Sequence, residues 1–342
     1  MSHRRVPESQ WGAGVAGGPI SRRAMLLGGI AGLATAQELF AQAGGKQPVD
    51  AGAAVSVQAD PRIGEIVADV SQDQLRETLE SLMVFPTRWS ESQGFGEVED
   101  WMARAFEARD PASGQNATRQ GYVMPSGNAR NNILWGDPMS GRPVILIGAH
   151  LDTISELPKL SAPGANDNGS GIVAMLEAQR VLAAHSFDHE IVFVAFTGEE
   201  QDLLGSRACA ERAAQDGWPI ALMVNLDMVG LRPPTPDFPL VIEYDQGNVR
   251  PSNDAPARAY GEAAADLAAA HTTLVTSHTD IWDSDYMPFE AEGFTCIGFY
   301  DGGADSDEYH TTGDVIELVD FARLEQVTRL LVATVSAAAG LQ

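Results

Sequence analysis

The sequence predicts an α/β fold in which a single mixed, mostly parallel central sheet is flanked by helices. Three mainly apolar runs of strand length, residues 143–149, 190–196 and 220–226, alternate with segments of helical periodicity. Strands without polar interruptions are typical of a parallel sheet that is covered on both faces. About 275 residues remain after the N-terminal region, which is enough for one large domain.

The other elements are expected in the following order along the chain. Two helical segments, 71–83 and 97–108, precede strands near 119–123 and 130–135. A helix over 171–185 connects two of the apolar strands. Beyond residue 239 we expect another strand, a helix through 254–270, a strand at 295–300 and a last amphipathic helix from Phe321.

Five side chains that can bind zinc occur in separate short motifs, and they follow the predicted strands. They are His150 in GAHLD, Asp167 in GANDNGSG, Glu200 in FTGEE, Asp227 in NLDM and His310 in EYHTTGD. Each alone has a plain structural interpretation, such as a helix N-cap for Asp167. Together they form the set of oxygen and imidazole ligands that two metal ions with one bridging carboxylate require.

Two further acidic residues complete this constellation. Glu199 precedes a predicted ligand, Glu200, and adjacent carboxylates repel each other unless a cation lies between them. Glu199 is therefore the free base of the set. Asp152 follows His150 by two positions. We expect its carboxylate to accept a hydrogen bond from the ring nitrogen that does not bind the metal, and so to orient the imidazole.

The chain resembles the co-catalytic dizinc aminopeptidases of family M28 (aminopeptidase Y and Streptomyces-type leucyl aminopeptidase). The resemblance rests on GAHLDT, GANDNGSG, FTGEE, NLDM, SDYMPF and YHTTGD, in this order, and covers roughly residues 70 to 340. It implies the zinc-exopeptidase (phosphorylase/hydrolase-like) fold and two Zn²⁺ ions. By the same resemblance, one ion is bound by His150 and Asp227 and the other by Glu200 and His310, with Asp167 bridging them.

The resemblance also implies the reaction. It is the hydrolysis of N-terminal peptide bonds by a zinc-bridging hydroxide, with Glu199 as general base and Tyr309 polarising the substrate carbonyl. The substrates would be N-termini of peptides or proteins. Two alternatives remain: a glutaminyl-cyclase-like acyltransferase with a single zinc, and a catalytically inactive binding domain. Retention of all five ligands and of the base argues against both.

Other hydrolase classes fit the sequence less well. A G-x-S-x-G motif is absent, and neither Cys209 nor Cys296 lies in a known catalytic signature. The 83 positions from Asp227 to His310 are too few for a lid domain in addition to the remaining core, which disfavours the M20-type carboxypeptidases and dipeptidases.

Three features depart from the family pattern or leave a question open. Many relatives have Ser-Asp-His where this chain has Ser284, Asp285 and Tyr286, so a phenol replaces that imidazole. The chain contains only two cysteines, whose pairing the sequence does not decide. His278 forms a second H-x-D pattern and is either a substrate contact or a packing residue.

The N-terminal segment predicts export by the twin-arginine translocation machinery. Arg22 and Arg23 precede an apolar stretch over 24–36, which is shorter than the ~20 residues of a membrane span. We expect a signal peptide over residues 1–43, cleaved after 41–43 rather than after 34–36. A flexible linker over 44–65 and a peptidase domain over 66–342 would follow. The mature protein would then be periplasmic or secreted, without a stable membrane anchor.

The charge of the chain restricts its partners. The formal net charge is −25 at pH 7, from 22 basic and 47 acidic residues. Such a surface repels nucleic acid and anionic lipid, so neither is expected as a partner. It favours solubility and is compatible with cationic peptide substrates.

Overall fold

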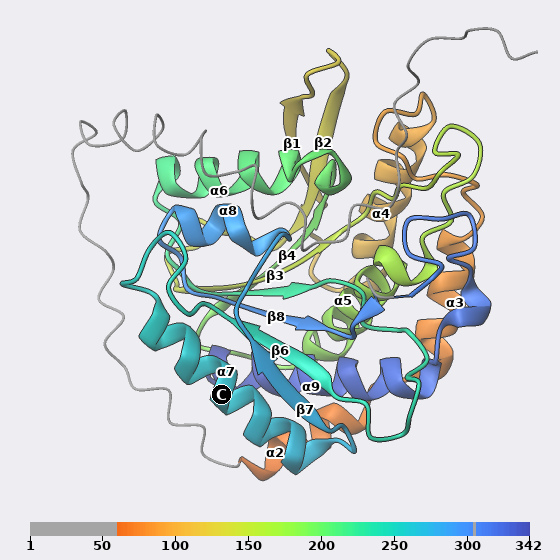
Figure 1. Ribbon diagram of the computed structural model, residues 1–342. Coiled ribbons are helices and arrows are strands. Elements are labelled where there is room, and N and C mark those ends of the chain that lie inside the picture. The colour runs from red at the N-terminus through yellow and green to blue at the C-terminus, as the bar shows by residue number, and fades with distance from the viewer. Residues whose placement is uncertain (1–59, 304–305) are drawn as a thin grey trace, which may run out of the picture. The chain divides into compact units, whose positions relative to one another are not determined.

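Eight strands form one sheet in the computed structural model, which describes residues 60–303 and 306–342 (Figure 1). The strand order is β1-β2-β4-β3-β5-β8-β6-β7. In chain order the strands are β1 (Thr118–Val123), β2 (Ala129–Trp135), β3 (Val144–His150), β4 (Glu190–Phe196), β5 (Ile220–Leu226), β6 (Leu240–Tyr244), β7 (Thr276–Thr279) and β8 (Cys296–Tyr300).

The four central strands are parallel. β3 pairs in parallel with β4 and β5, and β5 pairs in parallel with β8. β2 is antiparallel to β4, and β6 is antiparallel to β8. The predicted α/β fold with one mixed, mostly parallel sheet is confirmed. Because the central strands share one direction, their carboxyl ends meet at one edge, where open α/β sheets build their sites.

Helices cover both faces of the sheet (Figure 1). α6 and α8 pack on one face, and the larger core contains residues of the remaining helices. Alternate residues of β3 serve the two cores, with Val144 and Leu146 on the α6 and α8 side and Ile145 and Ile147 on the other. The helices are α2 (Pro61–Ala68), α3 (Gln72–Leu82), α4 (Phe95–Arg109), α5 (Gly171–Leu182), α6 (Leu204–Asp216), α7 (Asp254–His271), α8 (Tyr286–Ala291) and α9 (Phe321–Ala339).

The predicted linker over 44–65 is wrong in its last five residues, which begin helix α2. Asp60 caps this helix by accepting a hydrogen bond from the backbone N–H of Arg62, and Pro61 occupies the first turn. Ile63 and Ile66 are buried in the core. This local chemistry outweighs the Ala- and Gly-rich composition of the region. The predicted signal peptide over 1–43 and the linker up to residue 59 lie outside the described residues.

Two other sequence questions are answered by the fold. Cys209 and Cys296 are free thiols, buried in the core between the sheet and helices α6 and α8. In the described part of the chain, no helix has both the length and the apolarity that a membrane span needs.

Candidate metal centre

All five predicted ligands lie at the carboxyl edge of the central strands. His150 is the last residue of β3, and Asp227 directly follows β5. Glu200 lies in the short turn Glu199–Gln201 (η3) after β4, and Asp167 lies in the turn Ala165–Ser170 (η2) that leads into α5. His310 comes from the connection between β8 and α9. The fold thus brings together side chains that are up to 160 positions apart.

These residues form two triads that share Asp167. Nε2 of His150 lies 3.3 Å from Oδ1 of Asp167 and 3.5 Å from Oδ1 of Asp227. On the other side, Nε2 of His310 lies 3.3 Å from Oδ2 of Asp167 and 3.0 Å from Oε2 of Glu200. Within each triad the ligand atoms lie within 4.8 Å of one another. Each oxygen of Asp167 therefore faces a different triad, as a bridging carboxylate requires.

The electrostatics of the cluster fit bound cations. Oε1 of Glu200 and Oδ1 of Asp227 are buried without a hydrogen-bond partner, which is costly unless a cation binds there. Burial lowers the pKa of His310, but Asp167 and Glu200 outweigh it and raise that pKa to about 10. Burial, followed by the charge of Asp167, raises the pKa of Glu200 to about 7. The donor set of imidazoles and carboxylates suits zinc.

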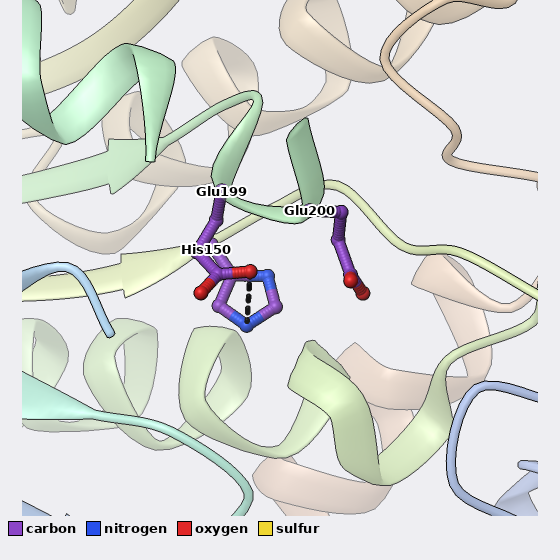
Figure 2. Close-up of side chains that lie close together, drawn as sticks. All are labelled: His150, Glu199 and Glu200. Carbon is purple, nitrogen blue, oxygen red and sulfur yellow. Dashed lines mark ion pairs between the residues drawn. The ribbon is translucent and has the colours of Figure 1, made fainter. Parts of the chain in front are cut away.

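Glu199 lies beside this cluster and belongs to neither triad that shares Asp167. Figure 2 shows its carboxylate next to the imidazole of His150, whereas the side chain of Glu200 lies apart from both. Oε2 of Glu199 is 4.0 Å from Nε2 of His150, and the side chain is 13% exposed. Glu199 also belongs to a third group of possible ligands, with His150 and Glu200. Glu199 is thus a carboxylate beside the cluster that neither of the two bridged triads uses.

A glycine determines how the two glutamates leave strand β4. Gly198 has a φ of +72°, in the left-handed region, and a Cβ at this position would lie 2.5 Å from the hydroxyl oxygen of Tyr122. No other residue fits here without strain. The glycine of the FTGEE motif therefore allows the chain to turn Glu199 and Glu200 toward the site.

Asp152 contacts His150 through its main chain, whereas the sequence led us to expect a contact through its carboxylate. Nδ1 of His150 contacts the main-chain carbonyl oxygen of Asp152 at 3.1 Å, not its carboxylate. The carboxylate instead accepts hydrogen bonds from the backbone N–H groups of Glu199 at 3.2 Å and Glu200 at 3.3 Å. The expected orientation of His150 by the Asp152 carboxylate is wrong, because the ring contacts the main-chain carbonyl while backbone N–H groups of the turn after β4 occupy the carboxylate. With its Nδ1–H bonded there, the imidazole presents Nε2 to the cluster.

Tyr309 lies against one of the ligands. Its ring stacks on the imidazole of His310, with ring centroids 3.7 Å apart and an interplanar angle of 24°. His310 itself has a φ of +57°, a conformation that costs a residue other than glycine about 1–3 kcal/mol and persists only where its surroundings hold it. The stacked ring of Tyr309 therefore helps to hold the imidazole of His310 in this conformation.

The two other ring side chains singled out in the sequence contact residues outside the triads. The hydroxyl of Tyr286 donates to Oε2 of Glu243 at 2.8 Å, and the side chain is fully buried. His278 is an exposed residue of the edge strand β7 and packs against Tyr244, with ring centroids 5.7 Å apart. This position favours the packing interpretation of His278.

Sequence reasoning missed three residues that hold the ligands in place. The carboxylate of Asp314 accepts hydrogen bonds from the backbone N–H groups of Asn166 and Asp167, both at 2.8 Å. The hydroxyl of Ser284 donates to Oδ2 of Asp227 at 2.7 Å. Asp314 ends the YHTTGD motif and Ser284 begins SDYMPF, so both lay in segments already singled out.

Arg88, the third missed residue, carries no comparable sequence signal. It is fully buried, and its guanidinium donates to the carbonyl oxygens of Leu151, Pro163 and Gly164 in the loop between two ligands. Burial lowers the pKa of Arg88 to about 10, while nearby carboxylates, with Asp314 first, act in the opposite direction. The group therefore stays charged at neutral pH and offsets part of the negative charge of the site.

Comparison with known proteins points to peptidases. A family model described as Peptidase family M28 matches residues 133–335. Over 330 residues, the chain is 26% identical to a "Probable zinc metalloprotease" of Pyrenophora tritici-repentis, covering 80% of this chain and 76% of that protein. It is 30% identical over 195 residues to a "Probable leucine aminopeptidase" of Trichophyton verrucosum, covering 54% of this chain and 52% of the relative.

Solved structures share the fold. The LapA aminopeptidase of Legionella pneumophila superposes with a TM-score of 0.74 at 20% identity, covering 90% of this chain and 80% of that structure. A glutaminyl cyclase of Porphyromonas gingivalis gives a TM-score of 0.65 at 18% identity, covering 78% of this chain and 98% of that structure. The fold alone therefore does not distinguish a peptide hydrolase from a cyclase. The residues of the site have to provide that distinction.

Proposed function

Since this chain belongs to peptidase family M28 and is a zinc-dependent peptidase, we propose that it is a dizinc aminopeptidase that releases residues from the N-termini of peptides. The observation that carries the proposal is the position of Asp167, whose two carboxylate oxygens face two separate triads at 3.3 Å. A single-zinc acyltransferase has no need of a bridging carboxylate. The relatives named as aminopeptidases point to the same activity.

The residues divide into two sets of ligands. His150 and Asp227 would bind one zinc ion, Glu200 and His310 the other, and Asp167 both. Two bound zinc ions supply Lewis-acid charge that polarises a peptide carbonyl and makes water acidic enough to lose a proton near neutral pH.

Glu199 provides the proton transfer. Its carboxylate accepts a proton from the attacking water and returns it to the nitrogen of the leaving amine. The side chain is well placed for both steps, because it is only 13% exposed and adjoins the cluster at His150. The Asp152 carboxylate fixes the backbone of Glu199 from behind, so the base is held in position before the substrate binds.

The excess of carboxylates favours a free N-terminus in the substrate. The ammonium group of an N-terminal residue is a positive charge that acidic groups around the zinc ligands would attract next to the scissile bond. An N-acetylated peptide lacks this charge. We therefore expect selectivity for free N-termini to follow from the charge of the site.

The proposal is tested by metal analysis together with a substrate panel. Purified protein should contain two zinc ions per chain, lose activity to a chelator and regain it with zinc. Aminoacyl p-nitroanilides should be hydrolysed, and their N-acetylated counterparts should not. Full activity with one zinc ion would refute the bridging role of Asp167, and efficient cleavage of acetylated substrates would refute the aminopeptidase assignment.

We also propose that the protein is exported by the twin-arginine route. The support is the sequence of residues 21–27, in which Arg22 and Arg23 precede a short apolar stretch. Replacing both arginines by lysine should retain the precursor in the cytoplasm, as cell fractionation would detect. N-terminal sequencing of the exported wild-type protein should show that it begins at Gly44. Unchanged secretion of the double variant would exclude this route.

A further inference from the structure

We propose that the protein also binds a calcium ion, at a site formed by the loop between β6 and α7 together with helix α8. Four carboxylates gather there: Asp245 directly follows β6, Asp254 begins α7, Asp280 directly follows β7 and Glu290 lies in α8. β6 is antiparallel to β8, so Asp245 adjoins the beginning of β8, whereas the metal centre lies at the carboxyl ends of the central strands. The calcium site is therefore separate from the metal centre and independent of the proposed peptidase chemistry.

Buried carboxylate oxygens without a hydrogen-bond partner occur in two places in the described part of the chain. One place is the metal centre, where these oxygens belong to Glu200, Asp227 and the neighbouring Asp285. The other place is the calcium site, where they are Oδ2 of Asp245, Oδ1 of Asp254 and Oε2 of Glu290. A buried carboxylate oxygen without a partner is costly unless a cation binds there. The second cluster thus shares with the metal centre the feature that points to a bound cation.

The two most buried carboxylates of the calcium site are each held by one oxygen. Oδ1 of Asp245 accepts hydrogen bonds from the backbone N–H groups of Gly247 at 3.2 Å and Asn248 at 3.1 Å. Oε1 of Glu290 accepts a hydrogen bond from the backbone N–H of Arg250. Asp245 is 1% exposed and Glu290 is 0% exposed, and in both the opposite oxygen is the one without a partner. The loop backbone therefore fixes both carboxylates and leaves one oxygen of each for a ligand.

The four carboxylates lie close enough to repel one another. Nδ2 of Asn248 donates to Oδ1 of Asp245 at 3.1 Å and to Oδ1 of Asp280 at 2.9 Å, so it joins these two residues. Burial raises the pKa of Glu290, and the charge of Asp245 acts in the same direction. Desolvation, followed by the charge of Asp245, likewise raises the pKa of Asp254. Among the described residues, no ion pair with a basic side chain offsets this negative charge.

The chemistry of the donors selects calcium. The atoms left for a ligand are all oxygens, and they include Oδ1 of Asn253, which is buried without a partner on a side chain that is 3% exposed. Oxygen ligands suit hard cations, whereas zinc favours imidazole and thiolate. In the described part of the chain, no three of the four carboxylates place oxygens within 4.8 Å of one another, as the zinc ligands do. Ca²⁺ accommodates this wider spacing, because oxygens on opposite sides of the ion are about 5 Å apart, whereas Mg²⁺ requires a compact octahedron.

Calcium binding should stabilise the folded protein. A cation that binds only the folded state raises Tm as its concentration exceeds Kd, and loop sites of this kind have a Kd of about 10⁻⁵–10⁻³ M. A hundredfold excess of calcium over Kd should then raise Tm by about 5–10 °C. The experiment is a calorimetric titration of the zinc-loaded, full-length protein with calcium chloride, followed by thermal unfolding with and without calcium. Sodium chloride at about 0.15 M suppresses general charge effects.

Two variants remove the oxygens that face the ligand and keep those that hold the loop. In Asp245→Asn and Glu290→Gln, the carbonyl oxygen can still accept the backbone hydrogen bonds, while the amide nitrogen replaces the oxygen without a partner. Each variant should bind calcium about tenfold more weakly or worse. Each should be at least as stable as the wild type without calcium, because a buried negative charge has been removed. The matched control is Glu292→Gln at the end of α8, whose carboxylate interacts with Glu211 instead of Asp245 and which should keep the full calcium response.

The results separate a specific site from charge screening. Binding of one calcium ion per chain, a higher Tm in the wild type and the control, and loss of both effects in Asp245→Asn and Glu290→Gln would support the proposal. The absence of binding heat, an equal rise in Tm with magnesium chloride, or an undiminished calcium response in Glu290→Gln would overturn it. Zinc content, measured on each sample, should be the same in all variants, so a failure of the proposed dizinc function is distinguishable from a failure of the calcium site.

Discussion

Replacing Glu199 by glutamine exchanges one carboxylate oxygen for an amide nitrogen. The change should remove proton transfer and leave metal binding intact. The amide has nearly the same shape as the carboxylate, and the ion contact of Glu199 with His150 is 4.0 Å long, too long for a hydrogen bond. The backbone bond from Glu199 to Asp152 does not depend on the side chain. We therefore expect Glu199→Gln to fold normally and to retain both zinc ions.

The expected loss lies in the chemical step. Glutamine has no basic oxygen to accept the proton of the attacking water, and loss of a positioned general base typically lowers the rate about 10²–10⁴-fold. At 1.36 kcal/mol for each factor of ten, this is about 2.7–5.5 kcal/mol of transition-state stabilisation. The decrease should appear in kcat, with KM nearly unchanged, because the residues that would hold the zinc ions, and with them the carbonyl-binding charge, remain.

The matched control is Glu200→Gln, which changes the adjacent residue by the same atom. Glu200 contacts His310 at 3.0 Å and belongs to the triad with Asp167, so this variant should lose zinc at one site and recover part of its activity with added zinc. Steady-state kinetics and metal analysis on both variants provide the comparison. Zinc loss in Glu199→Gln, with zinc retained in Glu200→Gln, would show that base and ligand are assigned the wrong way round.

Three further changes test the surroundings of the site. Arg88→Met should lower the free energy of unfolding by about 3–5 kcal/mol in urea titrations, because three carbonyl oxygens lose the guanidinium that donates to them and only that of Gly164 keeps another donor, the backbone N–H of Gly169; a loss below about 1 kcal/mol would contradict this. Tyr309→Phe should lower kcat about 10²-fold with zinc content unchanged, and full activity would remove the hydroxyl from the mechanism. Cys209 and Cys296 should not react with Ellman's reagent until the protein unfolds, because burial raises the pKa of both thiols; rapid labelling of the native protein would refute their burial.

Local sequence patterns were sufficient for seven of the eight strands and for the kinds of side chain in the cluster, but they missed the short edge strand β7. Strands β3, β4 and β5 are apolar except for His150, Glu190 and Asn225 at or near their ends, and such runs are typical of strands buried on both faces. His150 and Asp227 lie at the ends of two of these strands, so the direction of the chain alone sends them to the same edge. Composition was a weaker guide at residues 61–65, where one capping aspartate and one proline begin a helix.

Only the tertiary structure decided which groups contact each other. The sequence places two glutamates side by side after β4, but the left-handed turn at Gly198 determines that Glu200 meets His310 while Glu199 lies beside His150. Similarly, the sequence shows an aspartate two positions after His150, and the fold decides that its carbonyl rather than its carboxylate meets the ring.

The supporting contacts were beyond the reach of sequence patterns for a physical reason. Ser284 reaches Asp227 across 57 positions, and Arg88 reaches the loop before Asp167 across about 75. A pattern records the periodicity of neighbouring residues, whereas these contacts depend on how strands, turns and helices pack together in space. The sequence by itself determined the fold class and the kinds of side chain available for two metal ions. The packing decided how each of these side chains is held and which of them contact each other.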